Sequence, residues 1–234
     1  MKIFTENWRE VLNAFGVTVE MVLLAGLIAL VVGFVLAALR VSPIPLGRAI
    51  GTTYVYIVRN TPLLLLMFFF VFALPELGIR PELDLNQWLG LDSSQRLLNF
   101  NVFFLFATIA LGLYTAAFVC EALRSGINSI PVGQAEAARS IGMTFGQTLR
   151  HVVLPQAFRA VIPPLANALI AMTKNSSVAA GVGVTELTYL SRKYLNDNAT
   201  QLYAIFIGIA LFYIFLVALI ALTSALLERR TAVA

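Results

Sequence analysis

Long apolar runs alternate with shorter polar segments along the chain. A helix needs about 20 mostly apolar residues to cross a bilayer. Five segments meet this requirement, at Val11–Leu39, Ile50–Leu74, Val102–Cys120, Arg159–Gly181 and Leu202–Leu227. The second is the least regular, because Arg59, Asn60 and Pro62 interrupt it. Without a linker or a sequence repeat, the pattern predicts an all-α polytopic membrane protein: one domain over residues 1–234 with about five transmembrane helices.

Composition supports a membrane protein and argues against a nucleic-acid-binding one. The 234 residues are 59% hydrophobic and 12% charged, whereas a soluble domain has about 45–50% apolar and about 25% charged residues. The net charge is +4, but the basic residues lie beside apolar runs rather than on one wet face, so cytoplasmic loops explain them better. With one cysteine, Cys120, and one histidine, His151, the chain has no disulfide framework and no expected metal site.

The distribution of arginine predicts the orientation in the membrane. If the N-terminus is outside, the inner segments hold nine Arg and no Lys, at Arg40–Arg59, Glu121–Arg159 and Glu228–Ala234. The outer segments, which are the first ten residues, Glu76–Phe100 and Val182–Thr200, then hold six Lys or Arg and eight acids. Because cytoplasmic loops carry the excess of positive charge, we expect the N-terminus outside and the C-terminus in the cytoplasm.

The segment Ser125–Gln156 is too polar to span a membrane and carries two sets of helix signals. Pro131 suits the first turn of a helix, and several alanines that follow favour helix strongly. Gly142 can end this helix in a left-handed cap. Thr144 and Gln147 form a capping box for a second helix, and Pro155 is expected to end it before the next span.

Two interpretations of these short helices follow from the residues alone. Small residues on an exposed helix allow a partner to approach closely, so the helix can lie in the groove of another protein. The other interpretation is an amphipathic loop that lies on the membrane surface.

A sequence signature favours the first interpretation. The run GQAEAARSIGMTFGQTLRHVVLPQA resembles the EAA signature of the permeases of ABC importers. Its members match in order and spacing at Glu136, Ala137, Ala138, Gly142, Leu154 and Pro155. The resemblance implies that residues 125–158 form a cytoplasmic coupling loop that docks on an ATPase subunit. The residues it assigns to coupling are Gly133, Gln134, Glu136, Ala137, Ala138, Gly142, Leu154 and Pro155.

Other segments narrow the resemblance. YIVRNTPLLLLMFFF at Tyr56–Phe70, the stretch Tyr114–Ala138 and AMTKNSSVAAGVGVTEL at Ala171–Leu187 are similar to polar amino-acid permeases of the histidine, glutamine and glutamate type. The pieces RVSP, VRNTPL, EALRSGIN and GQAEAARS resemble most a glutamate-uptake permease subunit of actinobacteria. The resemblance therefore implies a polar amino acid as cargo and suggests glutamate.

The resemblance also implies partners and a location. It implies two ABC ATPase subunits that bind ATP and Mg, an extracellular substrate-binding protein, and a second permease subunit that is related to this chain rather than identical to it. The chain has no GxxxxGK[ST] phosphate loop, so we expect no ATPase site and no cofactor of its own. The expected location is the cell membrane.

Two basic residues are predicted to lie near the middle of the bilayer. Arg59 lies roughly 16 Å along a helix from Arg48, and Lys174 roughly 22 Å from Arg159, at 1.5 Å per residue. A charge at that depth costs at least about 2.5–3.5 kcal/mol and must be paired or hydrated. Polar or helix-breaking neighbours accompany both, which gives the candidate substrate pathway Arg59, Asn60, Thr61, Pro62, Lys174, Asn175, Ser176 and Ser177.

Other interpretations of these residues stay open. Arg59 and Lys174 can be structural, for example paired with Glu121, or Arg59 can extend to the cytoplasmic surface. Glu121 and Arg124 can be a plain pair at a helix end or a link to the coupling loop. For the whole chain, the alternatives are an ion-gradient-driven secondary transporter or channel, and a membrane scaffold without a transport role.

Overall fold

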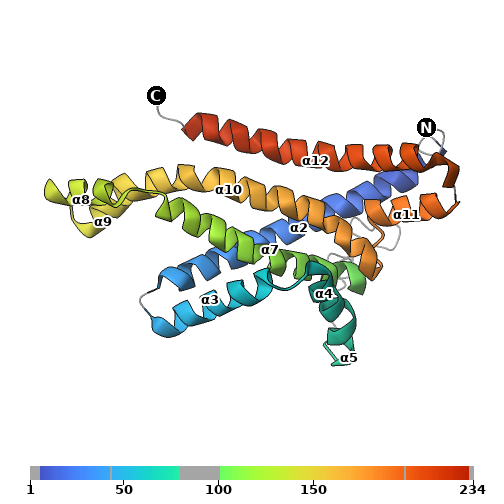
Figure 1. The fold of residues 1–234 in the computed structure, drawn as a ribbon, viewed down its shortest axis with the longest axis horizontal. Coiled ribbons are helices and arrows are strands. Elements are labelled where there is room, and N and C mark those ends of the chain that lie inside the picture. Colours follow the sequence, from blue (N-terminus) through green and yellow to red (C-terminus); the bar gives the residue numbers. More distant parts are fainter. Residues whose placement is uncertain (1–5, 43, 80–100, 198, 232–234) are drawn as a thin grey trace, which may run out of the picture.

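The computed structural model describes residues 6–42, 44–79, 101–197 and 199–231, and in these ranges every regular element is a helix (Figure 1). Four helical stretches are long and apolar enough to cross a membrane: α2 (Trp8–Val41), α7 (Val102–Asn128), the continuous stretch Phe145–Val182, and α12 (Leu202–Thr231). A bent pair of helices is a fifth candidate. The predicted all-α architecture with about five membrane helices is therefore confirmed.

The second predicted span, Ile50–Leu74, is wrong as a single helix. α3 (Pro45–Arg59) ends before Asn60, and α4 (Leu63–Phe68) continues through the π-helix η1 (Phe69–Ala73) into α5 (Leu74–Glu76). The two parts meet at 105°. The physical reason is Pro62, which has no N–H to donate and excludes helical backbone from the residue before it.

α7 is the central helix of the fold. Its most apolar 18 residues are 61% buried, against 22% for α2 and 17% for α12. Two glycines bring α7 and α2 into close contact. A Cβ on Gly33 would lie 2.6 Å from a methyl group of Val119, and one on Gly112 would lie 2.7 Å from Cβ of Ile28. Any larger side chain there would force the two helices apart.

α7 is longer than the sequence indicates. Its N-cap Asn101 accepts a hydrogen bond of 2.6 Å from the backbone N–H of Phe104, and the helix continues past the predicted end at Cys120 to Asn128. The first residues of the predicted loop 125–158 therefore belong to this helix. The charge at Glu121 does not end the helix, because Arg40 of α2 pairs with it.

The fourth span is one continuous helical stretch with three geometries. It begins with α9 (Phe145–Thr148), passes through the π-helix η2 (Leu149–Val153) into α10 (Leu154–Asn175), and tightens into the 3-10 helix η3 (Ser176–Val182). Gly183, with φ of +90°, ends it in the left-handed region that favours glycine. The expectation that Pro155 ends the second loop helix is wrong. The π-helical turn just before Pro155 leaves room for the proline ring, so the helix continues.

α11 (Leu187–Asp197) and the 3-10 helix η4 (Ala199–Gln201) connect η3 to α12. α11 is bound to α2 at its first residue and again in its second half. The backbone N–H of Leu187 donates to the hydroxyl of Thr18 over 3.3 Å, and Lys193 and Tyr194 both contact the carboxylate of Glu10. Figure 1 shows α7 and α10 in the middle of the molecule, with α12 along one edge and α3 along the other.

Three apolar clusters form the core, and α2 contributes to all of them. The largest joins α2 to α4, α7, α10 and η3 around Met21, Met67 and Met172. A second lies between the beginning of α2, α11 and α12. The third joins α2, α3 and α7 around Cys120, whose side chain is buried. Cys120 thus occupies the position of a small buried residue in the core.

Candidate functional site

The break between α3 and α4 lies at Asn60, Thr61 and Pro62. Because Pro62 interrupts the backbone hydrogen bonds of the helix, two polar side chains bind carbonyl groups near the end of α3 instead. The amide of Asn60 donates to the carbonyl of Tyr56 over 2.7 Å, and the hydroxyl of Thr61 donates to the carbonyl of Ile57 over 2.9 Å. The last helical residue before the break is Arg59. The break therefore places a cation at the end of a helix inside the apolar part of the chain.

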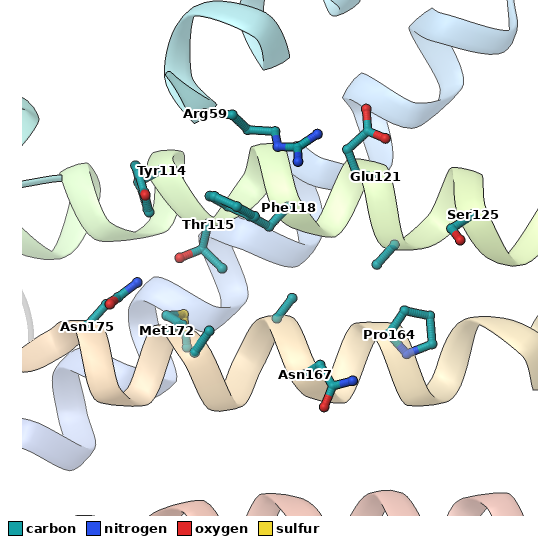
Figure 2. A pocket seen from close by; sticks show the side chains of 13 residues that line it. Arg59, Tyr114, Thr115, Phe118, Glu121, Ser125, Pro164, Asn167, Met172 and Asn175 are labelled. Atoms are coloured by element: carbon teal, nitrogen blue, oxygen red, sulfur yellow. The ribbon is translucent and has the colours of Figure 1, made fainter. Parts of the chain in front are cut away.

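A cavity of about 440 Å³ lies between α7, α10 and the end of α3 (Figure 2). The residues that line it are Arg59, Tyr114, Thr115, Phe118, Glu121, Ala122, Ser125, Pro164, Asn167, Ala168, Ala171, Met172 and Asn175. Their spacing of three or four along both helices puts one face of α7 opposite one face of α10. In Figure 2 the two helices run side by side, and Arg59 at the end of α3 lies close to Phe118 and Glu121 of α7.

The cavity lining has one cation, Arg59, and one anion, Glu121, and the two differ in the groups that they contact. The guanidinium of Arg59 lies 5.6 Å from the ring centroid of Phe118, a cation–π contact. Glu121, by contrast, forms an ion pair with Arg40 and lies 4.0 Å from Arg124. Because two further arginines surround the carboxylate, the field at this end of the cavity is positive, and an anionic group would be attracted to it.

The structure brings some of the predicted pathway residues together and separates others. Arg59 and Asn175 both line the cavity, although they come from different spans. Lys174 is exposed and lies outside the lining of this cavity. The hydroxyl of Ser176 is buried and donates to the carbonyl of Thr173 over 2.8 Å, and that of Ser177 donates to the carbonyl of Lys174 over 2.7 Å. Both serines thus stabilise the end of α10.

Sequence reasoning missed much of the cavity. Tyr114, Thr115 and Phe118 on α7 and Asn167 on α10 were not predicted as site residues, yet all four line it. A signal was available in the sequence: on each of these apolar helices the polar groups recur at helical spacing and so share one face. That pattern distinguishes a face toward a cavity from one toward lipid.

The loop helices have the predicted caps. α8 (Val132–Ser140) ends before Gly142, which has φ of +88°. The capping box is present, because the side chain of Gln147 accepts from the N–H of Thr144 over 2.9 Å and the hydroxyl of Thr144 accepts from the N–H of Gln147 over 3.3 Å. The predicted turn between two helices at Gly142 is therefore confirmed.

The outer surface of this loop carries exposed apolar side chains. Val132 is 72% exposed, Ile141 81% and Phe145 77%. Of the predicted coupling residues, Ala138 is buried against the rest of the loop, and the others described here stay accessible: Gly133, Gln134, Glu136, Ala137, Gly142, Leu154 and Pro155. Large exposed apolar residues at a polar loop indicate an interaction surface, either for another protein or for the membrane.

A second polar cluster surrounds Glu186, a residue that sequence reasoning did not select. Its carboxylate is fully buried at the start of α11 and accepts from the backbone N–H groups of Thr188 and Tyr189 over 2.9 and 3.0 Å. The hydroxyl of Tyr213 on α12 donates to it over 2.6 Å. Burial raises the pKa of Glu186, and these hydrogen bonds oppose the rise. The carboxylate thus joins α11 to α12.

The described residues were also compared with the requirements of a metal site. Within the described ranges, no group of three or more His, Cys, Asp or Glu side chains could hold a metal ion. The polar groups that line the cavity are an arginine, a carboxylate, hydroxyls and amides, beside aromatic rings.

Comparison with known proteins places these features in context. The model of the family described as binding-protein-dependent transport system inner membrane component matches residues 29–233. The glutamate transport system permease protein GluC of Corynebacterium glutamicum is 40% identical over 225 residues, which are 96% of this chain and 95% of that protein. The probable glutamine ABC transporter permease protein GlnM of Bacillus subtilis is 36% identical, covering 98% and 97%.

A solved structure has the same fold. The crystal structure of an amino acid ABC transporter with histidines superposes with a TM-score of 0.79 at 26% sequence identity. The alignment covers 97% of this chain and 96% of that one. The overall arrangement of helices described above therefore matches that of an amino acid ABC transporter.

Proposed function

The chain belongs to the family of binding-protein-dependent transport system inner membrane components, and we propose that it forms the path by which a polar amino acid, glutamate in particular, enters the cell. It is a multi-pass membrane permease subunit of an ABC importer. Glutamate is supported by the 40% identity to a glutamate transport system permease protein over nearly the whole chain.

The observation that carries the proposal is the charge balance of the cavity between α7 and α10. Glu121 is already paired with Arg40, whereas Arg59 contacts an aromatic ring. A substrate carboxylate can therefore bind Arg59 by charge-assisted hydrogen bonds without breaking a direct ion pair of Arg59 among the described residues. The amides of Asn167 and Asn175 on the opposite wall supply donors and acceptors for the rest of a polar amino acid.

The predicted pathway residues fit this cavity to different degrees. Arg59 and Asn175 would contact the substrate. Asn60, Thr61 and Pro62 would shape the break that positions Arg59, and Ser176 and Ser177 would stabilise the helix end beside Asn175. Lys174 would act from a distance through its charge, because its side chain lies outside the lining.

The loop between α7 and α10 is the proposed docking surface for the ATPase. Its exposed apolar side chains, Val132, Ile141 and Phe145, flank the residues of the EAA signature. The left-handed turn at Gly142 fixes the angle between α8 and α9. Because α9 continues without a break into α10, a movement of this loop would be transmitted along the helix that lines the cavity.

The proposed assembly follows from the family. It contains two ATPase subunits that bind ATP and Mg, an extracellular substrate-binding protein, and a second permease subunit that is related rather than identical. This chain supplies neither an ATPase site nor a cofactor. The proposed orientation has the N-terminus outside and residues 133–150 and the C-terminus in the cytoplasm, as the arginine distribution indicates. Of the outer segments, residues 80–100 lie outside the described ranges.

Uptake by the reconstituted complex in proteoliposomes tests the proposal. We expect ATP-dependent accumulation of labelled glutamate, faster than that of glutamine. Arg59→Gln should lower glutamate uptake by about tenfold or more, since a hydrogen bond to a charged group contributes about 1.5–3 kcal/mol. Arg229→Gln, at the exposed end of α12, serves as the control and should leave uptake unchanged.

Three results would count against parts of the proposal. Uptake driven by an ion gradient without ATP would exclude the ABC mechanism for this assembly. Equal uptake of glutamate and glutamine by the unmodified complex would exclude glutamate as the preferred cargo. Unchanged uptake with Arg59→Gln would remove Arg59 from the pathway.

A further inference from the structure

An apolar groove of about 750 Å³ lies between the beginning of α2 and the first half of α12. Ten residues line it, and apart from the indole N–H of Trp8 their side chains offer no hydrogen-bonding group. Ala204 and Gly208 on α12 keep the groove open, because a small side chain or none stands at each position. Phe15 packs against Phe212 and Phe215 at ring distances of 5.2 and 6.4 Å.

Water is a poor occupant of this groove. A water molecule needs two to four polar partners, which these walls do not provide. Both helices are candidate membrane spans, and less than a quarter of the most apolar 18 residues of each is buried, so the groove opens toward whatever surrounds the protein at bilayer depth. A flexible hydrocarbon chain fits these conditions.

One end of the groove has the features of the headgroup region. Trp8 lines this end and is 53% exposed, and the guanidinium of Arg9 lies 5.7 Å from the centroid of its ring. Tryptophan and arginine are typical of the membrane–water interface. The neighbouring Glu10 is bound by Lys193 and Tyr194. Among the described residues Arg9 forms no ion pair, so its charge is available to a phosphate, with exposed Glu6 as the other acid nearby.

We propose that this groove is a phospholipid-binding site, with an acyl chain between α2 and α12 and the lipid phosphate against Arg9. A second permease subunit is a less suitable occupant. The charged cavity with Arg59 and Glu121 cannot face hydrocarbon, so the partner subunit is needed on that face. The cavity lies between α7, α10 and α3, whereas α12 and α3 lie along opposite edges of the molecule (Figure 1).

The occupant can be identified by native mass spectrometry of the whole transporter released from nanodiscs. The unmodified complex should retain phospholipid. Ala204→Leu and Gly208→Leu fill the groove and should each lower the retained lipid at least about fivefold. The matched control is Ala221→Leu, which adds the same side chain to an exposed position of α12 outside the groove and should retain lipid as the unmodified complex does.

Trp8 itself reports on the headgroup. With Trp88→Phe, Trp8 is the only tryptophan of this chain, and in a complex whose other subunits lack tryptophan, lipids brominated on their acyl chains should quench it. Anionic phosphatidylglycerol should bind about fivefold more tightly than phosphatidylcholine, as expected for one basic residue near a membrane surface. Arg9→Gln should remove that preference while quenching persists.

Two outcomes would overturn the proposal. Equal lipid retention by Ala204→Leu and Ala221→Leu would show that the groove holds no bound lipid. Loss of the second permease subunit with Ala204→Leu, without loss of lipid, would show that the groove is a protein interface. Neither outcome touches transport of glutamate, so this site and the proposed function fail separately.

Discussion

α7 meets α2 on one side and α10 on the other, and the two contacts differ in kind. Against α2 it packs closely at two glycines, where a Cβ would lie 2.6 to 2.7 Å from the facing side chain. Against α10 it approaches closely at Gly126, where a Cβ would lie 2.3 Å from Val161, and elsewhere the two helices enclose the cavity. We call the α2–α7 contact the fixed base, because it is close at both of its glycines, and the α7–α10 contact the open side, because it encloses the cavity.

The largest expected effect comes from breaking the fixed base. Gly33→Leu should abolish the folded complex, because its side chain would overlap Val119 and the carbonyl of Ala116. Overpacking of this kind typically costs about 1–3 kcal/mol or more. Thermal unfolding in detergent and the yield of folded protein measure it. The control is Gly16→Leu on the same helix, which meets nothing within 4 Å and should unfold near the unmodified temperature. Equal stability of both variants would contradict a close-packed base.

The next effect concerns movement of the open side. Gly142→Val should lower uptake by more than about tenfold while the complex assembles and still hydrolyses ATP. A β-branched residue at φ of +88° is strained, so the angle between α8 and α9 should change. The loop movement that ATP hydrolysis drives should then no longer be transmitted to α10. Gly146→Val is the control, since Gly146 has no positive φ and nothing within 4 Å. Normal uptake with Gly142→Val would show that the turn is not needed for coupling.

Charge reversal on the same loop gives a related test. Glu136 is exposed on α8, inside the EAA signature. Glu136→Lys should abolish uptake through a mismatch with the ATPase surface, while the chain still inserts in the membrane. Copurification of the ATPase measures docking directly. If the ATPase still copurifies and uptake is normal, Glu136 lies outside the docking surface.

The share of the structure that can be predicted from the sequence differs between these regions. Apolar run lengths were enough to predict the number of spans, because lipid imposes a minimum length on each. They did not predict the break between α3 and α4 or the short helix α11. Local rules also located the turn at Gly142 and the cap at Thr144, where the deciding contacts lie within a few residues. They failed at Pro155, since a π-helical turn absorbs the proline, and at Cys120, where Arg40 from 80 residues away stabilises the continued helix.

The cavity was harder to predict because it depends on which faces of two helices meet. Arg59 stood out as a charge in an apolar run. Asn167 and Thr115 did not, because their importance depends on α7 and α10 diverging beyond Gly126. Lys174 looked equivalent to Arg59 in the sequence, yet the rotation of α10 places it outside the lining while its neighbour Asn175 faces the cavity.

That contrast between two cations predicts a smaller effect. Lys174→Met should lower glutamate uptake by only about fivefold or less, since a charge acting across water contributes about 1 kcal/mol. Arg59→Gln should lower it more, because Arg59 lines the cavity. Initial rates at several ionic strengths separate the two roles: added salt should shrink the effect of Lys174→Met and leave most of that of Arg59→Gln. A larger loss with Lys174→Met would show that the assembled permease pair brings Lys174 into the pathway.

The smallest expected effect is a change in pH dependence at Glu186, whose carboxylate joins α11 to α12. Burial raises the folded-state pKa of Glu186 above its ordinary 4.5. The proton therefore binds the folded state more tightly, and its contribution to stability is present below about pH 4.5 and is lost as the pH rises through the raised pKa.

Glu186→Gln cannot titrate, so the unfolding temperature of the unmodified complex minus that of the variant should fall between pH 4 and pH 7.5. The matched variant Tyr213→Phe removes one donor to the carboxylate, keeps the titrating group, and should enlarge that fall. A difference between the unmodified complex and Glu186→Gln that stays constant with pH would show that Glu186 holds the same protonation in the folded and unfolded chain.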